Sequence, residues 1–164
     1  MKNNIWMRSP IGVIGLIWAD DKIRNVLLPG QEYPNLSTRE SFMDSNEDPP
    51  NWVSSIITQI KSYFSRQSST FSLDCLNYDL FTDFQKRVHH AVTSIPCGET
   101  RSYSEIASEI KSPGSARAIG NVMANNPFPI IVPCHRVVTK AGDLGGYRGG
   151  LHLKKFLLQL EQDL

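Results

Sequence analysis

The sequence predicts an α+β protein in which an N-terminal antiparallel sheet with one packed helix precedes a mostly helical domain. Three observations predict this class: short apolar segments separated by turn residues, an apolar stripe of period four after Trp52, and two helix-capping sequences after Phe81. We expect domains at 1–78 and 79–164. At 164 residues, 40% of them hydrophobic, the chain suits one domain or two small ones.

The first third has the pattern of an antiparallel sheet. We expect strands at residues 5–8, 13–19 and 23–28, separated by the turn sequences Ser9-Pro10-Ile11-Gly12 and Ala19-Asp20-Asp21-Lys22. Residues 29–50 are rich in Pro, Ser and Asp and predict a surface loop.

One helix and one more strand are expected before the boundary. The helix follows from apolar residues that recur every four positions and would pack on the sheet: Trp52, Ile56, Ile60 and Phe64. Alternation of Phe71, Leu73 and Cys75 with polar residues then predicts a further strand.

The second domain reads as helical. Thr82-Asp83-Phe84-Gln85 and Ser102-Tyr103-Ser104-Glu105 both have the form of a capping box, so helices should begin there and reach about Ile95 and Ile110. We expect Ser112 to cap a third helix, with Pro113 at its first position and its end near Ala124. Two short helices around a tight turn predict a helix-turn-helix, and a purely structural helical hairpin is the alternative.

A last helix should carry an apolar face made of Leu153, Phe156, Leu157 and Leu160. Glu161 lies four residues after Leu157, so its carboxylate should point toward the interior. A lone buried charge is costly unless it is paired, and an imidazolium would satisfy it.

Reactive groups concentrate in Pro133-Cys134-His135-Arg136-Val137. A Cys beside a His is the outline of an activated thiolate, whereas a buried Cys that only fills space is the competing interpretation. If this segment is extended, the side chains of Cys134 and His135 point to opposite sides, and a water molecule must bridge them.

Charge and cysteine usage narrow the class of protein. The net charge of +1 conceals a basic segment, since residues 84–155 hold ten Lys or Arg against four Asp or Glu, a net charge of +6. Such a segment is typical of a DNA-binding surface, although scattered charges on a solvated face give the same count.

Three cysteines without a Cys-x-x-Cys pair argue against a disulfide framework and against a metal site. No apolar run approaches a membrane span, and we expect an intracellular protein.

About half of the chain resembles one family in the order and spacing of its motifs. The matching elements are Phe84-Gln85, Ile95-Pro96-x-Gly98-Glu99-Thr100, Ser102-Tyr103, Ala116-Arg117-Ala118-Ile119-Gly120, Asn126-Pro127, Pro133 to Val137, Gly146-Tyr147, Gly149-Gly150-Leu151 and Glu161. This pattern resembles the O6-alkylguanine-DNA alkyltransferases. His89, at a position usually occupied by Trp, and Cys97, at one usually aromatic, depart from it.

The resemblance implies the following chemistry. Cys134 would accept the alkyl group from a damaged guanine, irreversibly and once per molecule. His135 would abstract the thiol proton through water, and Glu161 would hold the other imidazole nitrogen. Asn126 would tie the helix-turn-helix to the active-site loop. The N-terminal domain would be ribonuclease H-like, no cofactor would be needed, and the protein would act as a monomer on double-stranded DNA.

The resemblance also implies how DNA is held. Arg117 would intercalate where the flipped base was, and Tyr103 would crowd the phosphate and promote flipping. Ala116, Gly120 and Ala124 form a ridge of small residues that would lie in the minor groove, although such residues also permit close helix packing. Ser102 and Ala118 would also contact the DNA. The flipped base would be contacted by Tyr147, Arg148 and Val137.

The sequence therefore predicts a DNA repair enzyme, a methylated-DNA–protein-cysteine S-methyltransferase acting mainly on O6-methylguanine. Two other classes remain open at this point. One is a helix-turn-helix DNA-binding regulator with a structural Cys134, and the other is a thiol hydrolase acting on a small molecule.

Overall fold

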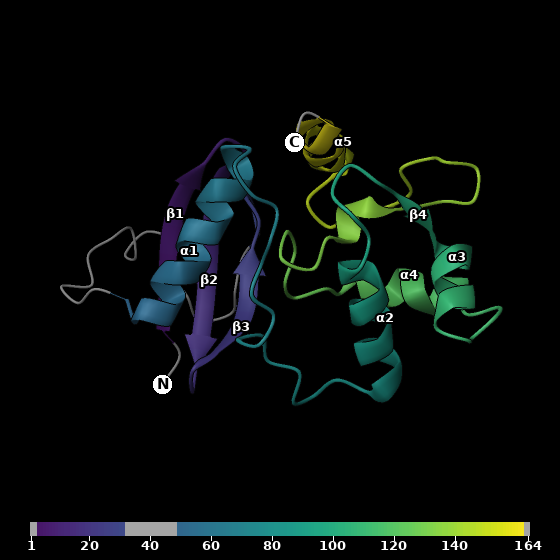
Figure 1. Cartoon of the computed structure of the whole chain (residues 1–164), viewed down its shortest axis with the longest axis horizontal. Helices are drawn as coiled ribbons and strands as arrows, with labels where there is room; N and C mark the ends of the chain where they lie inside the picture. The colour runs from purple at the N-terminus through teal and green to yellow at the C-terminus, as the bar shows by residue number, and fades with distance from the viewer. Residues whose placement is uncertain (1–2, 32–48, 163–164) are drawn as a thin grey trace. The chain divides into compact units, whose positions relative to one another are not determined.

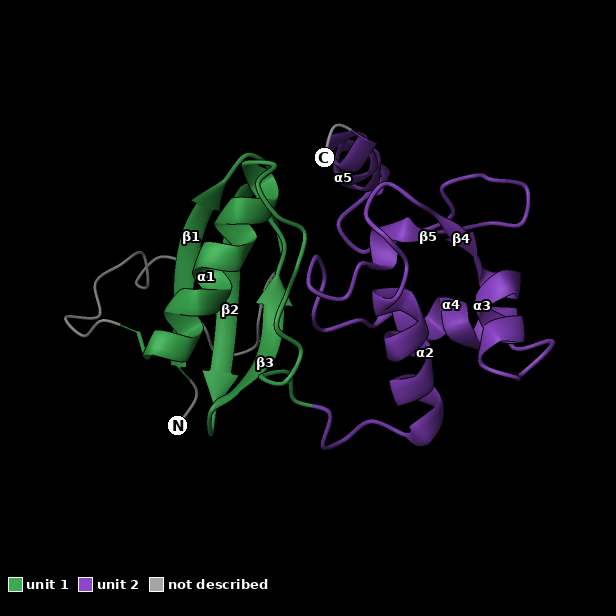
Figure 2. Cartoon of the chain, viewed as in Figure 1, with its two compact units in different colours: residues 1–77 green, residues 78–164 purple. Residues whose placement is uncertain are grey.

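A computed structural model describes residues 3–31 and 49–162. Over these residues the chain is α+β, as predicted, with a three-stranded antiparallel sheet and five α-helices (Figure 1). It divides into two compact units, residues 1–77 and 78–164 (Figure 2). No helix in the described ranges is long and apolar enough to cross a membrane.

The first unit contains the three predicted strands. They are β1 (Asn3–Ser9), β2 (Gly12–Ala19) and β3 (Lys22–Leu27), paired in that order. Trp6 of β1 lies opposite Gly15 and packs with Ile17 and Leu27. A Cβ atom at Gly15 would lie 2.6 Å from the Trp6 ring, so only glycine allows the indole to lie across β2.

The predicted helix is confirmed as α1 (Asn51–Phe64), which lies against the sheet with Val53, Ile56 and Ile60 buried (Figure 1). The strand predicted from Phe71 to Cys75 was wrong. Residues 71–75 form no strand, and only Leu76 makes a single bridge, to Ile23. Alternating apolar residues form a strand only where a neighbour offers a ladder of backbone partners. Of the expected loop at 29–50, residues 32–48 lie outside the described residues.

The second unit begins with the two predicted capping boxes, and both are confirmed. Thr82 caps α2 (Asp83–Thr93) and Ser102 caps α3 (Tyr103–Glu109), with the side chain of Gln85 or Glu105 bonded back to the cap. These bonds satisfy backbone N–H groups that the first turn of a helix leaves without partners.

The third helix of this unit, α4 (Ala116–Ala124), begins later than predicted. Ser112 and Pro113 lie in the preceding turn, and Ser115 is the N-cap. The reason is Gly114, whose φ of +86° is incompatible with a helix. The unit continues through a single 3₁₀ turn, η1 (Cys134–Arg136), a short parallel pair of β4 (Arg101–Ser102) with β5 (Val137–Val138), and α5 (Leu151–Gln162).

His89 of α2 lies in an aromatic cluster. Its ring packs edge-on against Tyr78, Phe81 and Phe128, with the Phe81 centroid 4.9 Å away. Its side chain is buried, as expected for a packing residue, whereas the neighbouring His90 is exposed. Burial lowers the pKa of His89 to about 4, so the ring is neutral at pH 7.

We expect this histidine to weaken the fold in acid. Between pH 6.5 and 4, His89 is protonated in the unfolded chain but stays neutral in the folded protein. The free energy of unfolding should therefore fall by about 3 kcal/mol over this range. Urea unfolding at pH 7 and pH 4.5 measures this fall. It should shrink in His89→Phe and persist in the exposed control His90→Phe. Equal pH dependence in the two variants would contradict the prediction.

Candidate active site

Cys134 lies at a pocket of about 410 Å³ in the second unit. The pocket is formed by α3, the second half of α4, the η1 turn and the loop before α5. Its lining residues are Tyr103, Gly120, Met123, Ala124, Cys134, Gly146, Tyr147 and Arg148. Of these, Met123 and Gly146 were given no role in the site, and Ala124 was predicted only for the ridge that would meet DNA.

The sequence predicted an extended backbone at Cys134. This prediction was wrong, because the residue lies in the η1 turn. Pro133 enters the turn with ψ of 64°, and the Arg136 N–H donates to the Pro133 carbonyl at 2.9 Å. With three residues per turn, consecutive side chains point about 120° apart. The turn therefore directs Cys134, His135 and Arg136 in three different directions.

The Cys134 thiol is buried, and burial raises its pKa above the ordinary value. The Asn126 side chain and the charge of Lys154 oppose this shift without cancelling it. Cys134 is thus protonated at neutral pH in the free protein. Its nucleophilic form requires a base that removes the proton.

A candidate for that base lies in the same turn. His135 is fully buried, and its Nε2 lies 2.6 Å from Glu161 Oε1. Burial lowers the pKa of His135 against the opposing effect of Glu161, so the imidazole is neutral at pH 7. A neutral ring that donates from Nε2 to a carboxylate keeps Nδ1 as its basic nitrogen. Glu161 therefore sets both the orientation and the tautomer of His135.

Glu161 points inward from α5, as predicted, but its charge is balanced by Arg136 rather than by an imidazolium. Arg136 donates from Nε to Oε2 at 2.9 Å and from Nη2 to Oε1 at 3.0 Å, and its Nη1 donates to the Ile95 carbonyl at 2.6 Å. Burial disfavours the charged carboxylate, yet the bonds from His135 and Arg136 outweigh it and hold the pKa of Glu161 well below its usual range.

The role of Arg136 was missed, although the residue stands inside the reactive pentapeptide. A bidentate guanidinium is a permanent positive charge that a titrating histidine cannot replace. Because Arg136 neutralises Glu161, the imidazole of His135 is left uncharged and able to accept a proton.

Asn126 follows α4 and is 2% exposed. Its Nδ2 donates to the Val132 carbonyl at 2.9 Å, and its Oδ1 accepts from the Phe128 N–H at 3.0 Å. These bonds join the end of α4 to the segment that enters η1. The side chain also lowers the pKa of Cys134 through a hydrogen bond.

Lys154 is a second residue whose role was missed. It is fully buried, and its ammonium donates to the carbonyls of Val137 at 2.6 Å, of Leu144 and of Gly146. Burial lowers the pKa of Lys154 to about 8. By contrast, Phe156, predicted to be in the apolar face of α5, is 41% exposed. Lys154 and Glu161 are seven residues apart on one helix face, which is the signal that could have identified the lysine.

Lys154 ties down the loop that carries Tyr147. Burial, followed by Cys134, raises the pKa of Tyr147 far above its ordinary value. Burial likewise raises the pKa of Tyr103 on the other wall. The pocket is thus walled by two neutral phenols, while Arg148 at its edge is exposed.

The residues predicted to contact DNA differ in their exposure to solvent. Arg117 and Ala118 are exposed in the first turn of α4, and Ala116 and Gly120 are half-buried beside them. Ser102 is 7% exposed, and its hydroxyl accepts from the Glu105 N–H in the capping box. The predicted base contact Val137 is buried, with its carbonyl accepting from Lys154.

These features define a class of site: a thiol-dependent group-transfer centre with a neutral, carboxylate-held imidazole. All three cysteines lie in the described ranges, where none forms a disulfide. Those ranges also contain no cluster of three or more His, Cys, Asp or Glu side chains that could hold a metal.

Comparisons with known proteins identify the family. Residues 83–163 match the family described as 6-O-methylguanine DNA methyltransferase, DNA binding domain. A methylated-DNA–protein-cysteine methyltransferase of Mycobacterium bovis is 41% identical over 155 residues, which cover 94% of this chain and 88% of that protein. One from Methanothermobacter thermautotrophicus is 36% identical over 98% of this chain and 85% of its own.

Comparison with solved structures leads to the same family. The crystal structure of Mycobacterium tuberculosis O6-methylguanine methyltransferase is similar with a TM-score of 0.81 and 38% identity, covering 99% of this chain and 94% of its own. That of Mycobacterium tuberculosis OGT in complex with DNA gives 0.79 and 38%, covering 98% and 92%. The chain belongs to the methylated-DNA–protein-cysteine methyltransferase family.

Proposed function

We propose that this protein repairs O6-alkylguanine in double-stranded DNA by moving the alkyl group, mainly methyl, onto Cys134. The observation that carries this proposal is the buried, protonated thiol at a base-sized pocket, in the same turn as a neutral histidine held by Glu161 and Arg136. Family membership supports the same reaction.

The proposed reaction balances without a cofactor. His135 takes the thiol proton at Nδ1, through a water molecule, and the carboxylate of Glu161, held in place by Arg136, stabilises the imidazolium that forms. The sulfur then attacks the alkyl carbon, so an S–C bond forms while the bond from that carbon to O6 breaks. The electron pair stays on the guanine, which takes one proton from water at N1 and returns to its normal form, while the imidazolium releases the proton of the thiol to water. The thioether has no good leaving group, so the protein is used once.

The pocket walls suit a flipped guanine. We assign Tyr103 to the sugar-phosphate side, and Tyr147 and the Arg148 N–H to the alkylated edge of the base. The Cys134 and Val137 carbonyls would accept from the exocyclic amine, which separates guanine from adenine. The Val137 carbonyl is already bonded to Lys154, so it would accept from the base through its second lone pair.

The DNA surface is assigned to α3 and α4, which we interpret as a helix-turn-helix. Small residues, Ala116, Gly120 and Ala124, would let α4 lie in the minor groove, with Ala118 and Ser102 at its borders. The exposed Arg117 would fill the gap left by the flipped nucleotide. On this interpretation residues 79–164 carry binding and chemistry, whereas residues 1–78 form a ribonuclease H-like domain. The protein would act as a monomer inside the cell, where its DNA substrate is.

Mixing the protein with excess O6-methylguanine duplex tests the proposed function. Repaired guanine should plateau at one per protein molecule, and intact mass should rise by one CH₂ on the peptide that contains Cys134. Continued turnover would indicate a hydrolase. Absence of any mass gain, with DNA binding retained, would favour a regulator with a structural cysteine.

Arg117 provides a separate test of nucleotide flipping. Arg117→Ala should slow transfer from duplex DNA far more than transfer from free O6-benzylguanine, which needs no flipping. Single-turnover rates on both substrates measure the ratio, and Lys111→Ala, at another exposed cation before α4, is the matched control. Equal slowing on the two substrates would mean that Arg117 supports the fold or the pocket instead.

A further inference from the structure

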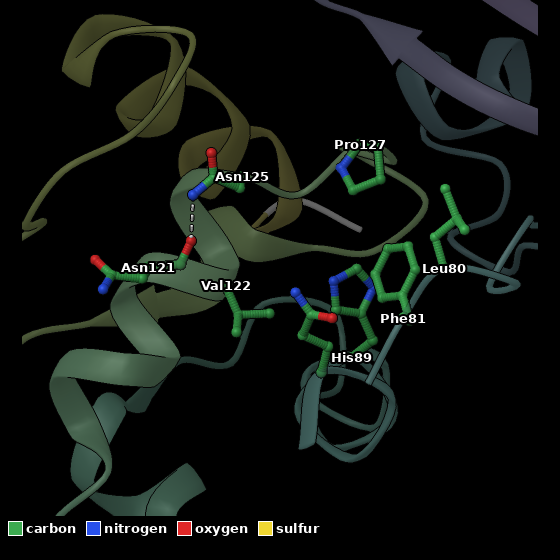
Figure 3. A pocket seen from close by; sticks show the side chains of 8 residues that line it. Leu80, Phe81, His89, Asn121, Val122, Asn125 and Pro127 are labelled. Carbon is green, nitrogen blue, oxygen red and sulfur yellow. Dashed lines mark hydrogen bonds between the residues drawn. The ribbon is translucent and has the colours of Figure 1, made fainter. Parts of the chain in front are cut away.

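A second pocket, of about 370 Å³, lies in the same unit and shares no lining residue with the Cys134 pocket. It is bounded by Leu80 and Phe81 ahead of α2, by His89 of α2, and by Asn121 and Asn125 near the end of α4. Figure 3 shows the ring of His89 beside Phe81, with Val122 of α4 extending toward them and the amides of Asn121 and Asn125 extending away from the two rings in this view. We call it the His89 pocket.

His89 is the unusual member of this lining. It is 1% exposed, and within the described part of the chain neither of its ring nitrogens has a hydrogen-bond partner. Its neighbours Tyr78, Phe81 and Phe128 offer only ring edges and faces. A buried polar ring without partners is rare in proteins and calls for an explanation such as an absent ligand. The neutral ring carries one donor and one acceptor.

The rest of the lining favours an uncharged, planar ligand. Amide side chains of Gln85, Asn121 and Asn125 supply both donors and acceptors, and the Asn125 amide is held by the Asn121 carbonyl at 2.8 Å (Figure 3). No Asp, Glu, Lys or Arg is among the lining residues. Leu80, 91% exposed, offers an apolar surface at the rim. These groups match a heteroaromatic ring with a polar edge and do not match a phosphate.

The position of the pocket narrows the ligand further. Arg117, Asn121 and Asn125 follow one another at intervals of four along α4, so they share one face of the helix. If Arg117 enters the DNA, as the proposed function requires, this row continues along the duplex toward the His89 pocket. The molecules there that are neutral, planar and polar-edged are nucleobases.

We propose that the His89 pocket binds a second nucleobase, from an unpaired position in the DNA that Arg117 enters or as a free nucleoside. This inference rests on the proposed function for the position of the DNA. The base would stack against Phe81 and Leu80, and its edge would meet the Gln85 amide and the imidazole. Binding needs no chemistry at Cys134.

The test compares three probes with undamaged protein: a fully paired duplex, the same duplex with one bulged adenine, and free adenosine. Binding is measured by fluorescence anisotropy, and the imidazole signals of His89 by ¹⁵N NMR. The bulged duplex should bind about tenfold more tightly than the paired one, the contribution of one stacked base. His89 signals should shift, whereas those of the exposed His90 should not.

Two variants alter the His89 pocket, and a third variant, outside the pocket, is the control. His89→Phe removes the ring nitrogens and Val122→Phe occupies the space, so either should abolish the preference for the bulge; His90→Phe should keep it. A shift of His89 with adenosine alone would assign the site to free nucleosides as well. Equal binding of both duplexes with unmoved His89 signals, or a preference that survives both variants, would overturn the proposal.

Benzyl transfer from free O6-benzylguanine is followed in the same samples. Transfer by every variant together with no bulge preference would refute the His89 pocket alone. Failure of the wild-type protein to transfer would refute the proposed function, and the nucleobase inference would then be judged by adenosine binding.

Discussion

Cys134→Ala is expected to abolish alkyl transfer entirely and to leave the affinity for duplex DNA nearly unchanged. The thiol is the strongest nucleophile among the side chains that line the pocket, whose two tyrosines are neutral phenols, so its loss removes the reaction and not merely a fraction of the rate. Affinity should survive because removal of the thiol leaves the exposed first turn of α4, which carries Arg117, unchanged. Intact mass after incubation with methylated duplex, and fluorescence anisotropy on the same duplex, measure the two quantities.

Cys97→Ala and Cys75→Ala are the matched controls, since both cysteines are half-buried and distant in sequence from the η1 turn. Each should keep a full methyl transfer to Cys134. A methyl group on either of these residues, or a loss of DNA binding in Cys134→Ala comparable to the loss of transfer, would contradict the assignment.

Arg136→Met should cost about 3 to 5 kcal/mol of stability, because it leaves Glu161 buried without its guanidinium. The same change should slow transfer strongly, since an unbalanced Glu161 raises the proton affinity of His135 or becomes protonated itself. Urea unfolding gives the stability, and the benzyl transfer rate gives the chemistry. The control is Arg101→Met, which removes a half-exposed pair with Glu109 and should cost less than about 1 kcal/mol.

The pH dependence of unfolding separates the ion pair from simple packing. Because the pKa of Glu161 is held below its usual range, the stabilisation it provides is present above about pH 4.5 and is lost as the pH falls below that value. Arg136→Met should lose much of this acid sensitivity, and Arg136→Met combined with Glu161→Gln should recover part of the stability. If the single variant kept the full wild-type pH dependence, the pair would not be the cause.

Features governed by local bonds could be predicted from the sequence. The capping boxes at Thr82 and Ser102 involve residues three apart, so the chain specifies them without reference to the rest of the fold. The hairpin strands and the stripe of α1 were equally accessible, because apolar period and turn chemistry are local. The start of α4 failed only because the positive φ of Gly114 displaced the cap from Ser112 to Ser115.

Features governed by distant partners could not be read in the same way. The alternation at Phe71 to Cys75 lacked a strand to pair with, and the η1 turn at Cys134 depends on the entry from Pro133 and on Asn126. The inward direction of Glu161 followed from helix spacing, but the choice of Arg136 as its partner depends on where η1 meets α5. The role of Lys154 could not be predicted for the same reason, because its carbonyl partners lie in other segments of the chain.

The carboxylate of Glu161 joins three parts of the chain that are made at different times. Arg136 and His135 contact it directly, and the Gly98 N–H donates to its Oε2 at 3.3 Å. During synthesis Cys134 therefore emerges well before the helix that orients its base. A protein that can react only once gains from this order, because a partly made chain holds an unactivated thiol and cannot spend it on other electrophiles. On the proposed mechanism, activation of the nucleophile would therefore wait until α5 supplies Glu161.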